Sequence, residues 1–318
     1  MSEAYPLPEP AAGPHGPPTA DVVDPRRRRR ADGALVVAAF FFGTTFLVVQ
    51  DAVDDASPVG FIAVRFLLGA GVLAVAARLR GRPGTPGELR HGVMAGLALL
   101  AGYVLQTVGL QYTSAATSAF LTYLLVVFVP LLAWVVLGRR PHWLTAVGVA
   151  LAVAGMALLT GGGDAGFGRG EVLTLGCAVA FAVHILVLGE TAGRHDPVRL
   201  TCVQLLTVGL ACLVPAAATG GLAMPASAFA AAAFTGVFAT ALAFLLMVGA
   251  QRVVSPARAA LVLLLEPVFA ALLGWATGDP FTAAAAAGGA LVVAAVVVAE
   301  VVPAALADRA SRRAAVRD

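Results

Sequence analysis

The chain has 318 residues, of which 59% are hydrophobic and 12% charged, and its mean hydropathy is +0.89. A soluble domain usually carries about 25% charged residues, so this composition excludes an ordinary water-soluble protein. All 21 positive residues are arginines in a chain of net charge +3, and nearly all lie in loops and tails, which does not indicate nucleic-acid binding. The apolar residues fall in runs of about 18–25, long enough for a helix to cross a hydrocarbon core roughly 30 Å thick.

Two tails flank the apolar part of the chain. The stretch from Met1 to Pro25 contains seven prolines and no apolar period, which predicts a disordered cytoplasmic tail over residues 1–32. Arg26–Arg30 precede the first apolar run and place the N-terminus in the cytoplasm. Residues 303–318 are the second predicted cytoplasmic tail. Between the tails we expect ten transmembrane helices at residues 33–52, 59–78, 92–111, 116–137, 142–161, 171–189, 198–218, 227–250, 256–277 and 282–302.

The connections between these spans alternate in charge. Arginines occupy the connections that follow the second, fourth, sixth and eighth spans, and also the C-terminal tail. The intervening connections hold five aspartates, and Arg169 is their one positive residue. Ten spans with both termini in the cytoplasm therefore satisfy the positive-inside rule, and a miscount by one helix would destroy the alternation.

The second half of the chain repeats the first. One constant register aligns the third to fifth spans with the eighth to tenth without a gap, and a register shorter by one places Pro58 on Pro197. The coincident residues of the first register are Gly96 with Gly236, Val108–Gln111 with Val248–Gln251, Gly138 with Gly278, and Gly148 with Gly288. We predict an all-α integral membrane protein with two five-helix repeats, residues 33–161 and 171–302. Because five is odd, the second repeat is inverted, as in many secondary transporters.

Several segments also carry a family resemblance. They are Phe42–Phe46, Pro58–Arg65, Val108–Ser118, Ala119–Pro130 and Leu265–Phe269, with the glycine-bearing spans around Gly148 and Gly288. Over residues 33–302 the chain resembles the EamA-domain family of the drug/metabolite transporter superfamily. The resemblance implies a ten-helix permease that moves small organic metabolites, such as amino acids or drug-like compounds, often outward. Gly138-Arg139 and Gly278-Asp279 stand where that family usually has Gly-Glu.

Glu266 is the first candidate site residue, because it lies about ten residues from either end of the ninth span and thus near the midplane. A carboxyl at this depth could exchange a proton during transport. It could equally support the backbone around Pro267, which removes a helical hydrogen bond. Its counterpart in the first repeat is Val126, so the fold does not demand an acid there.

Further polar candidates occupy matched positions of the two repeats. Arg65 lies seven residues beyond Pro58 and aligns with Gln204. Its guanidinium could attract a substrate carboxylate or extend outward to anchor the second span. Thr44 and Thr45 lie in the middle of the first span, and His184 aligns with Thr45. For His184 a packing histidine is favoured over a proton relay.

The remaining candidates lie in the third, fourth and ninth spans. Tyr103, Gln106 and Tyr123 are polar or aromatic and suit hydrogen bonds between helices as well as ligand contact. Pro130 and Pro267 are expected to kink the fourth and ninth spans, either to gate a site or to allow packing.

Three classes of function remain in view: a secondary transporter, an intramembrane enzyme, and a non-transporting receptor or assembly subunit. Gly161–Gly163 lacks the Gly-Lys-Ser/Thr of a nucleotide-binding loop, and no Gly-x-Ser-x-Gly or His-Glu-x-x-His occurs. We therefore expect a transporter and not an enzyme, with no cofactor and no metal. The expected partners are a small-molecule substrate and the lipid bilayer, with the proton as a candidate coupling ion. Substrate identity, direction of transport and oligomeric state stay open.

Overall fold

The computed structural model describes residues 24–50, 56–161, 168–278, 280 and 282–302. In this part of the chain every regular element is a helix, including one 3₁₀ turn (η1) and two π-helical turns (η2 and η3). The elements are α1 (Pro25–Gln50), α2 (Pro58–Arg80), α3 (Glu88–Gly109), α4 (Ala115–Tyr123), α5 (Leu125–Leu137), α6 (Trp143–Thr160), α7 (Arg169–Thr191), η1 (Ala192–Arg194), α8 (Pro197–Ala218), α9 (Ala226–Thr235), η2 (Gly236–Leu242), α10 (Ala243–Gln251), α11 (Pro256–Leu263), α12 (Leu265–Thr277), α13 (Ala283–Val296) and η3 (Val297–Val301).

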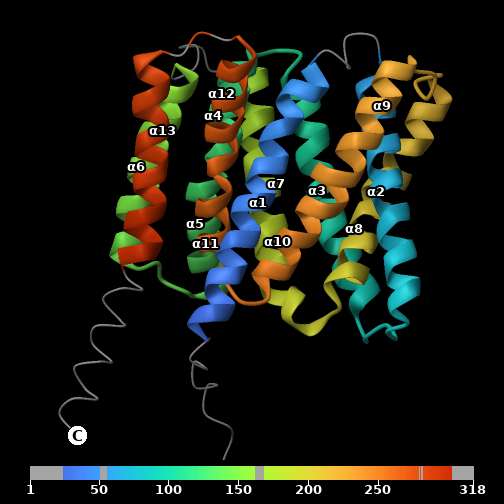
Figure 1. The fold of residues 1–318 in the computed structure, drawn as a ribbon, viewed down its shortest axis with the longest axis horizontal. Coiled ribbons are helices and arrows are strands. Elements are labelled where there is room, and N and C mark those ends of the chain that lie inside the picture. Colours follow the sequence, from blue (N-terminus) through green and yellow to red (C-terminus); the bar gives the residue numbers. More distant parts are fainter. Residues whose placement is uncertain (1–23, 51–55, 162–167, 279, 281, 303–318) are drawn as a thin grey trace, which may run out of the picture.

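These helices form one bundle in which the described chain crosses from end to end ten times (Figure 1). Eight helical stretches are long and apolar enough to cross a membrane, and Ala283–Ala299 is a shorter apolar helix. Large side chains such as Leu79, Val135 and Val214 are exposed, as expected of a surface that faces lipid. α1 begins at one end of the bundle and α7 at the other (Figure 1), which confirms the predicted fold of two inverted five-helix repeats.

The start of α1 differs from the sequence-based prediction. The tail was expected to run to residue 32, but the helix begins at Pro25. The Asp24 carboxylate accepts a hydrogen bond from the Arg26 amide at 2.9 Å, and proline suits the first position of a helix. The arginine run is therefore helical, and Asp32 lies inside α1. Residues 1–23 and 303–318 lie outside the described residues.

The repeat appears in the element boundaries. The register that aligns Gly138 with Gly278 also places α5 on α12 from first residue to last, and both glycines end their helix with a positive φ, 68° and 119° respectively. The register shorter by one places the start of α2 at Pro58 on the start of α8 at Pro197. Equivalent sequence positions thus adopt equivalent local structure in the two halves.

Both repeats interrupt the same span at the same position. α4 stops before Leu124 (φ −61°, ψ −7°), and α11 stops before the equivalent residue of the second repeat, Leu264 (φ −62°, ψ −8°). Pro267 lies three residues beyond the second interruption and cannot donate to the Leu263 carbonyl. Pro130 lies farther inside α5, and no proline stands three residues beyond Leu124. The interruption therefore belongs to the repeat, whichever residues support it.

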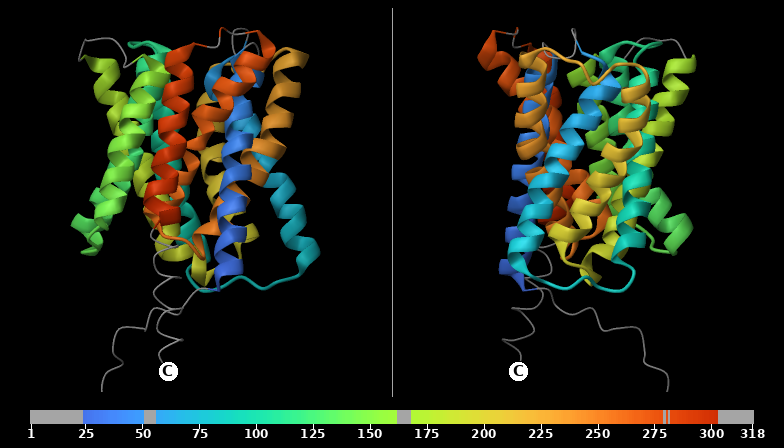
Figure 2. Two further views of the ribbon diagram at one scale, coloured as in Figure 1. Left: turned by 60° about the vertical axis from the view of Figure 1, so that its left-hand side comes forward. Right: turned by 90° about the vertical axis from the view of Figure 1, so that its right-hand side faces the viewer.

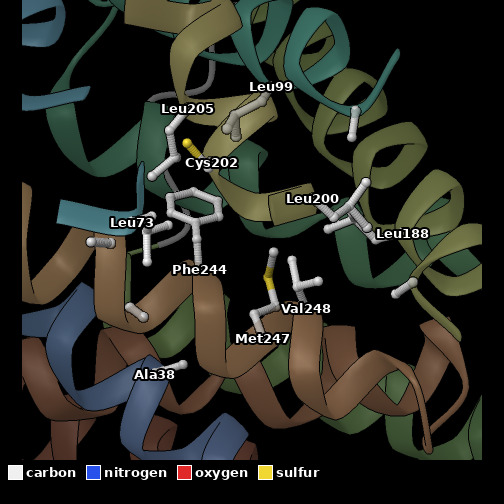
Figure 3. Packing of buried hydrophobic residues seen from close by; sticks show 14 of the residues in the cluster. Ala38, Leu73, Leu99, Leu188, Leu200, Cys202, Leu205, Phe244, Met247 and Val248 are labelled. Carbon is white, nitrogen blue, oxygen red and sulfur yellow. The ribbon is translucent and has the colours of Figure 1, made fainter. Parts of the chain in front are cut away.

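The core lies where the repeats meet. α2 packs along α8, α3 along α7, and α6 along α13. Figure 3 shows Phe244, Met247 and Val248 against residues of the surrounding helices. At the α6–α13 contact, a Cβ added to Gly288 would lie 2.6 Å from the Gly155 carbonyl oxygen, so these helices approach through their glycines.

Candidate functional site

Arg65 is a buried cation inside the bundle. Ser57 caps α2 and Pro58 starts it, so Arg65 lies two turns along the helix. The residue is 7% exposed, its Nε donates to the Thr240 hydroxyl at 2.6 Å, and its guanidinium lies 5.9 Å from the Phe66 ring centroid. An arginine keeps its charge even inside a membrane, so its position requires acceptors or counter-charges. Thr240 supplies one acceptor from the other repeat.

The partner Thr240 lies in the π-helical turn η2 (Gly236–Leu242). Such turns disturb the regular hydrogen-bond ladder and often occur at functional sites. Thr240 was not among the predicted site residues. Its equivalent in the first repeat is Leu100, so a comparison of polar with apolar residues between the repeats could have found it.

Glu266 is the acid that approaches this cation. It lies in the first turn of α12, directly after the interruption at Leu264, where the helix dipole favours a negative charge. The Tyr123 hydroxyl lies near its carboxyl group, and Arg65 is close enough to act on that group electrostatically. Among the described residues Arg65 and Glu266 form no direct ion pair. Glu266 is partly exposed, whereas its equivalent Val126 is 1% exposed.

Tyr103 from α3 packs against Phe66, the residue next to Arg65. Its ring packs edge-on against Phe66, with centroids 5.1 Å apart, and against Phe181 at 5.7 Å. Electrostatic interactions link its hydroxyl to Arg65 and Glu266. We call Arg65, Tyr103, Tyr123, Thr240 and Glu266 the central cluster. Three of these residues come from the first repeat and two from the second, so the cluster spans the interface between the repeats.

His184 and Gln204 form a separate polar pair within the second repeat. His184 Nε2 lies 2.8 Å from Gln204 Oε1, and the two residues are 2% and 0% exposed. The His184 ring also packs edge-on against Phe244 at 5.9 Å. These two predicted site residues therefore lie close together, and they form a hydrogen bond to each other in the packed core.

The other predicted residues make local contacts. The Thr44 and Thr45 hydroxyls donate to the carbonyls of Phe41 and Phe42 in their own helix, at 2.7 and 2.6 Å. Gln106 donates to the Thr122 hydroxyl at 3.2 Å. Near the central cluster, α1 approaches α12 at a residue the sequence analysis did not single out: a Cβ added to Gly43 would lie 2.8 Å from the Glu266 carbonyl oxygen.

Ion pairs gather at one end of the bundle, the end at which α1 begins, which we call the arginine-rich end. Each pair joins one repeat to the other, and the Arg258 guanidinium forms two bonds of 2.6 Å to the Asp32 carboxylate. The pairs are Arg258 with Asp32, Arg199 with Glu88, Arg82 with Asp196, and Arg139 with Glu190. No ion pair between described residues lies at the opposite end. Ion pairs therefore join the two repeats at the arginine-rich end.

Two inverted helical repeats with a polar cluster between them define a membrane transporter. The described residues hold no group of three or more His, Cys, Asp or Glu side chains that could bind a metal ion. The EamA-like transporter family matches the chain twice, at residues 29–161 and 168–300. The chain belongs to this family.

Individual relatives agree with this assignment. An uncharacterized transporter of Archaeoglobus fulgidus is 31% identical over 74% of this chain and 73% of its own length. The uncharacterized inner membrane transporter YedA of Escherichia coli is 28% identical over 74% and 79%. A probable terminal-alkyne amino-acid exporter of Streptantibioticus cattleyicolor is 27% identical over 63% and 69%. One solved crystal structure shares the fold, with a TM-score of 0.74 and 21% identity over 88% of this chain and 99% of the other.

Proposed function

We propose that this protein is a secondary transporter that exports small zwitterionic metabolites, such as amino acids, across the cytoplasmic membrane by alternating access. The observation that carries the proposal is the relation between Arg65 and Glu266. Opposite repeats contribute opposite charges to one cluster, in which Arg65 donates a hydrogen bond to Thr240 and Glu266 lies near Tyr123. The two charges interact without forming a direct ion pair in the described structure.

A zwitterion complements this arrangement. A guanidinium can bind a carboxylate through two parallel hydrogen bonds, so Arg65 would receive the substrate carboxylate. A carboxylate accepts hydrogen bonds from an ammonium group, so Glu266 would receive the substrate amine. The partly exposed Tyr103 ring would lie beside the rest of the substrate, which suits apolar or aromatic side chains. The Streptantibioticus cattleyicolor relative, which is named as an amino-acid exporter, supports this substrate class and this direction.

Alternating access follows from the inverted repeats and the ion pairs at the arginine-rich end. Two copies of one unit in opposite orientations can exchange conformations, which opens the site first to one side and then to the other. The four inter-repeat ion pairs hold the arginine-rich end together, so opening that end requires them to separate. The excess of arginines at this end supports, through the positive-inside rule, our proposal that it faces the cytoplasm.

The experiment is counterflow in proteoliposomes that contain the purified chain. The panel holds α-amino acids, the matching carboxylic acids without the amine, and the matching amines without the carboxyl group. The variant is Arg65→Gln, which installs the residue type found at the equivalent position, Gln204. Loss of a charge-assisted hydrogen bond worth about 1.5–3 kcal/mol predicts a roughly 10- to 100-fold lower kcat/KM for amino acids, and no change for the amines.

Arg80→Gln is the matched control, because Arg80 is an exposed arginine at the end of the same helix. It should transport like the parent chain. Absence of amino-acid flux in the parent, or equal loss of amine and amino-acid flux in Arg65→Gln, would contradict the zwitterion site.

A further inference from the structure

A pocket of about 550 Å³ opens at the arginine-rich end, apart from the central cluster. Its lining comes from the end of α2, the start of α3 and the first turns of α8. The right-hand view of Figure 2 shows α2 and α3 apart at this end, with their connecting loop crossing below. Ala74, in the pocket wall, lies nine residues beyond Arg65, about 13 Å along the helix axis. The pocket is therefore a different site from the one proposed for transport.

Arginines dominate the charge of this pocket. Arg78, Arg82 and Arg199 line it together with a single acid, Glu88. Glu88 pairs with Arg199 at 2.6 Å, and Arg82 pairs with Asp196 at 3.2 Å. No carboxylate among the described residues pairs with Arg78. The pocket thus offers a positive charge to a ligand after its internal ion pairs are counted.

The opposite part of the pocket wall is apolar. Ala74, Val75, Ala77 and Val203 line it on the side nearer the middle of the bundle. Val75 is 59% exposed and Leu79, one turn farther along α2, is 83% exposed, so this wall continues into the outer surface of the helix. A ligand in the pocket would meet guanidinium groups at the membrane boundary and apolar side chains toward the membrane interior.

The rim of the pocket is an ordered structure. The loop between α2 and α3 is held at Thr85, whose hydroxyl lies 2.6 Å from His195 Nδ1. His195 Nε2 in turn lies 2.7 Å from His91 Nδ1 on α3. Glu88 is only 5% exposed at its side chain, and it accepts hydrogen bonds from both Thr85 and Arg199. These contacts hold the rim of the pocket and the Arg199 guanidinium in place before any ligand arrives.

We propose that this pocket binds an anionic phospholipid from the leaflet at the arginine-rich end. The headgroup phosphate would contact Arg78, with Arg82 and Arg199 nearby, and one acyl chain would lie along Ala74, Val75 and Val203. A phosphate group is common to lipids and to soluble metabolites. The apolar wall and its continuation into the exposed face of α2 favour the lipid, because a soluble phosphate would leave that wall unused.

The test measures lipid binding by the full chain in detergent at about 0.15 M salt, by native mass spectrometry and by thermal unfolding with added lipid. The probes are phosphatidylglycerol, phosphatidylcholine, and glycerol 3-phosphate as the soluble headgroup. The parent chain should bind phosphatidylglycerol in preference to phosphatidylcholine and should not respond to glycerol 3-phosphate. Arg78→Ala should weaken phosphatidylglycerol binding about fivefold, the effect of one arginine at a membrane surface.

Arg80→Ala is the matched control. Arg80 lies two residues beyond Arg78 and carries the same charge, but its side chain does not line the pocket. It should change phosphatidylglycerol binding less than about twofold at this salt concentration. Ala74→Phe tests the apolar wall without any change in charge, and should also reduce binding. Equal effects of Arg78→Ala and Arg80→Ala would overturn the proposal in favour of general surface attraction. An Arg78-dependent response to glycerol 3-phosphate would overturn the lipid assignment.

Discussion

The two repeats share a backbone but not the chemistry that it carries. At four equivalent positions the first repeat has Thr45, Arg65, Leu100 and Val126, and the second has His184, Gln204, Thr240 and Glu266. The cation of the central cluster comes from the first repeat, and its acid and hydroxyl acceptor come from the second. In the second repeat, the residues equivalent to Thr45 and Arg65 bond to each other in the core.

This comparison separates what the fold needs from what the central cluster adds. Val126 is 1% exposed at a position whose equivalent is Glu266, and both positions follow the same interruption of the helix. The backbone therefore accepts an apolar residue at that position. A carboxylate inside a membrane protein is costly, so its presence in only one repeat supports our proposal that Glu266 serves transport.

The largest predicted effect on transport comes from replacing Glu266 with the residue that the first repeat has at the equivalent position. Glu266→Val installs the first repeat's residue, and should leave folding intact while amino-acid transport falls roughly 10- to 100-fold, the loss expected for a charge-assisted hydrogen bond. Counterflow in proteoliposomes measures transport, and thermal unfolding measures stability. Glu266→Gln keeps the shape and removes the charge, and should also abolish any dependence of transport on the proton gradient.

Asp24→Asn is the control for this pair of variants, because Asp24 is an exposed carboxylate outside the central cluster and asparagine caps a helix as well as aspartate does. Its amino-acid transport should stay close to that of the parent. Undiminished amino-acid transport by Glu266→Val would refute the role of the acid in substrate binding. Unchanged pH dependence of transport in Glu266→Gln would refute proton coupling through this residue.

A smaller effect is expected when the acceptor of Arg65 is removed. Thr240→Val preserves the shape of the side chain but deletes the hydroxyl that accepts from Arg65 Nε at 2.6 Å. Hydrogen bonds to charged groups contribute about 1.5–3 kcal/mol, so we expect KM for amino acids to rise by about tenfold, near the low end of that range. Thr207→Val is the control, because the Thr207 hydroxyl bonds only its own helix at the Val203 carbonyl. Equal KM values for the two variants would show that Thr240 does not position the guanidinium.

The smallest effect concerns His184 and Gln204, which form a hydrogen bond to each other within the second repeat. A double-mutant cycle with His184→Leu and Gln204→Leu should give a coupling energy of about 0.6–1.7 kcal/mol in unfolding experiments, the range for hydrogen bonds between membrane helices. The double variant should transport amino acids much like the parent, since neither residue belongs to the central cluster. A coupling energy of zero would indicate that the 2.8 Å contact does not stabilise the fold.

The sequence predicted the spans and their symmetry well, because both depend on local composition and on the spacing of glycines and prolines. The interruption at Leu124 escaped it, since no proline or glycine marks that position and the same residue type occurs throughout the spans. Thr240 was not predicted as a site residue because it lies in an apolar segment, and no residue type in that segment marks a π-helical turn. The pairing of His184 with Gln204 depends on how α7 packs against α8, and the sequence of either helix alone does not predict that packing.

The interruption at Leu264 divides one span into two parts with different attachments. α11 is anchored to α1 through the bonds from Arg258 to Asp32, and α12 carries Glu266. Both parts therefore contact α1, α11 through this ion pair and α12 where Gly43 meets the Glu266 backbone, and Leu264 joins them. A change of angle at this joint would move the acid relative to Arg65 while the anchored segment keeps its contacts. The first repeat has the same interruption at Leu124. The helix that follows it, α5, carries Val126, so a change of angle there would displace no charge.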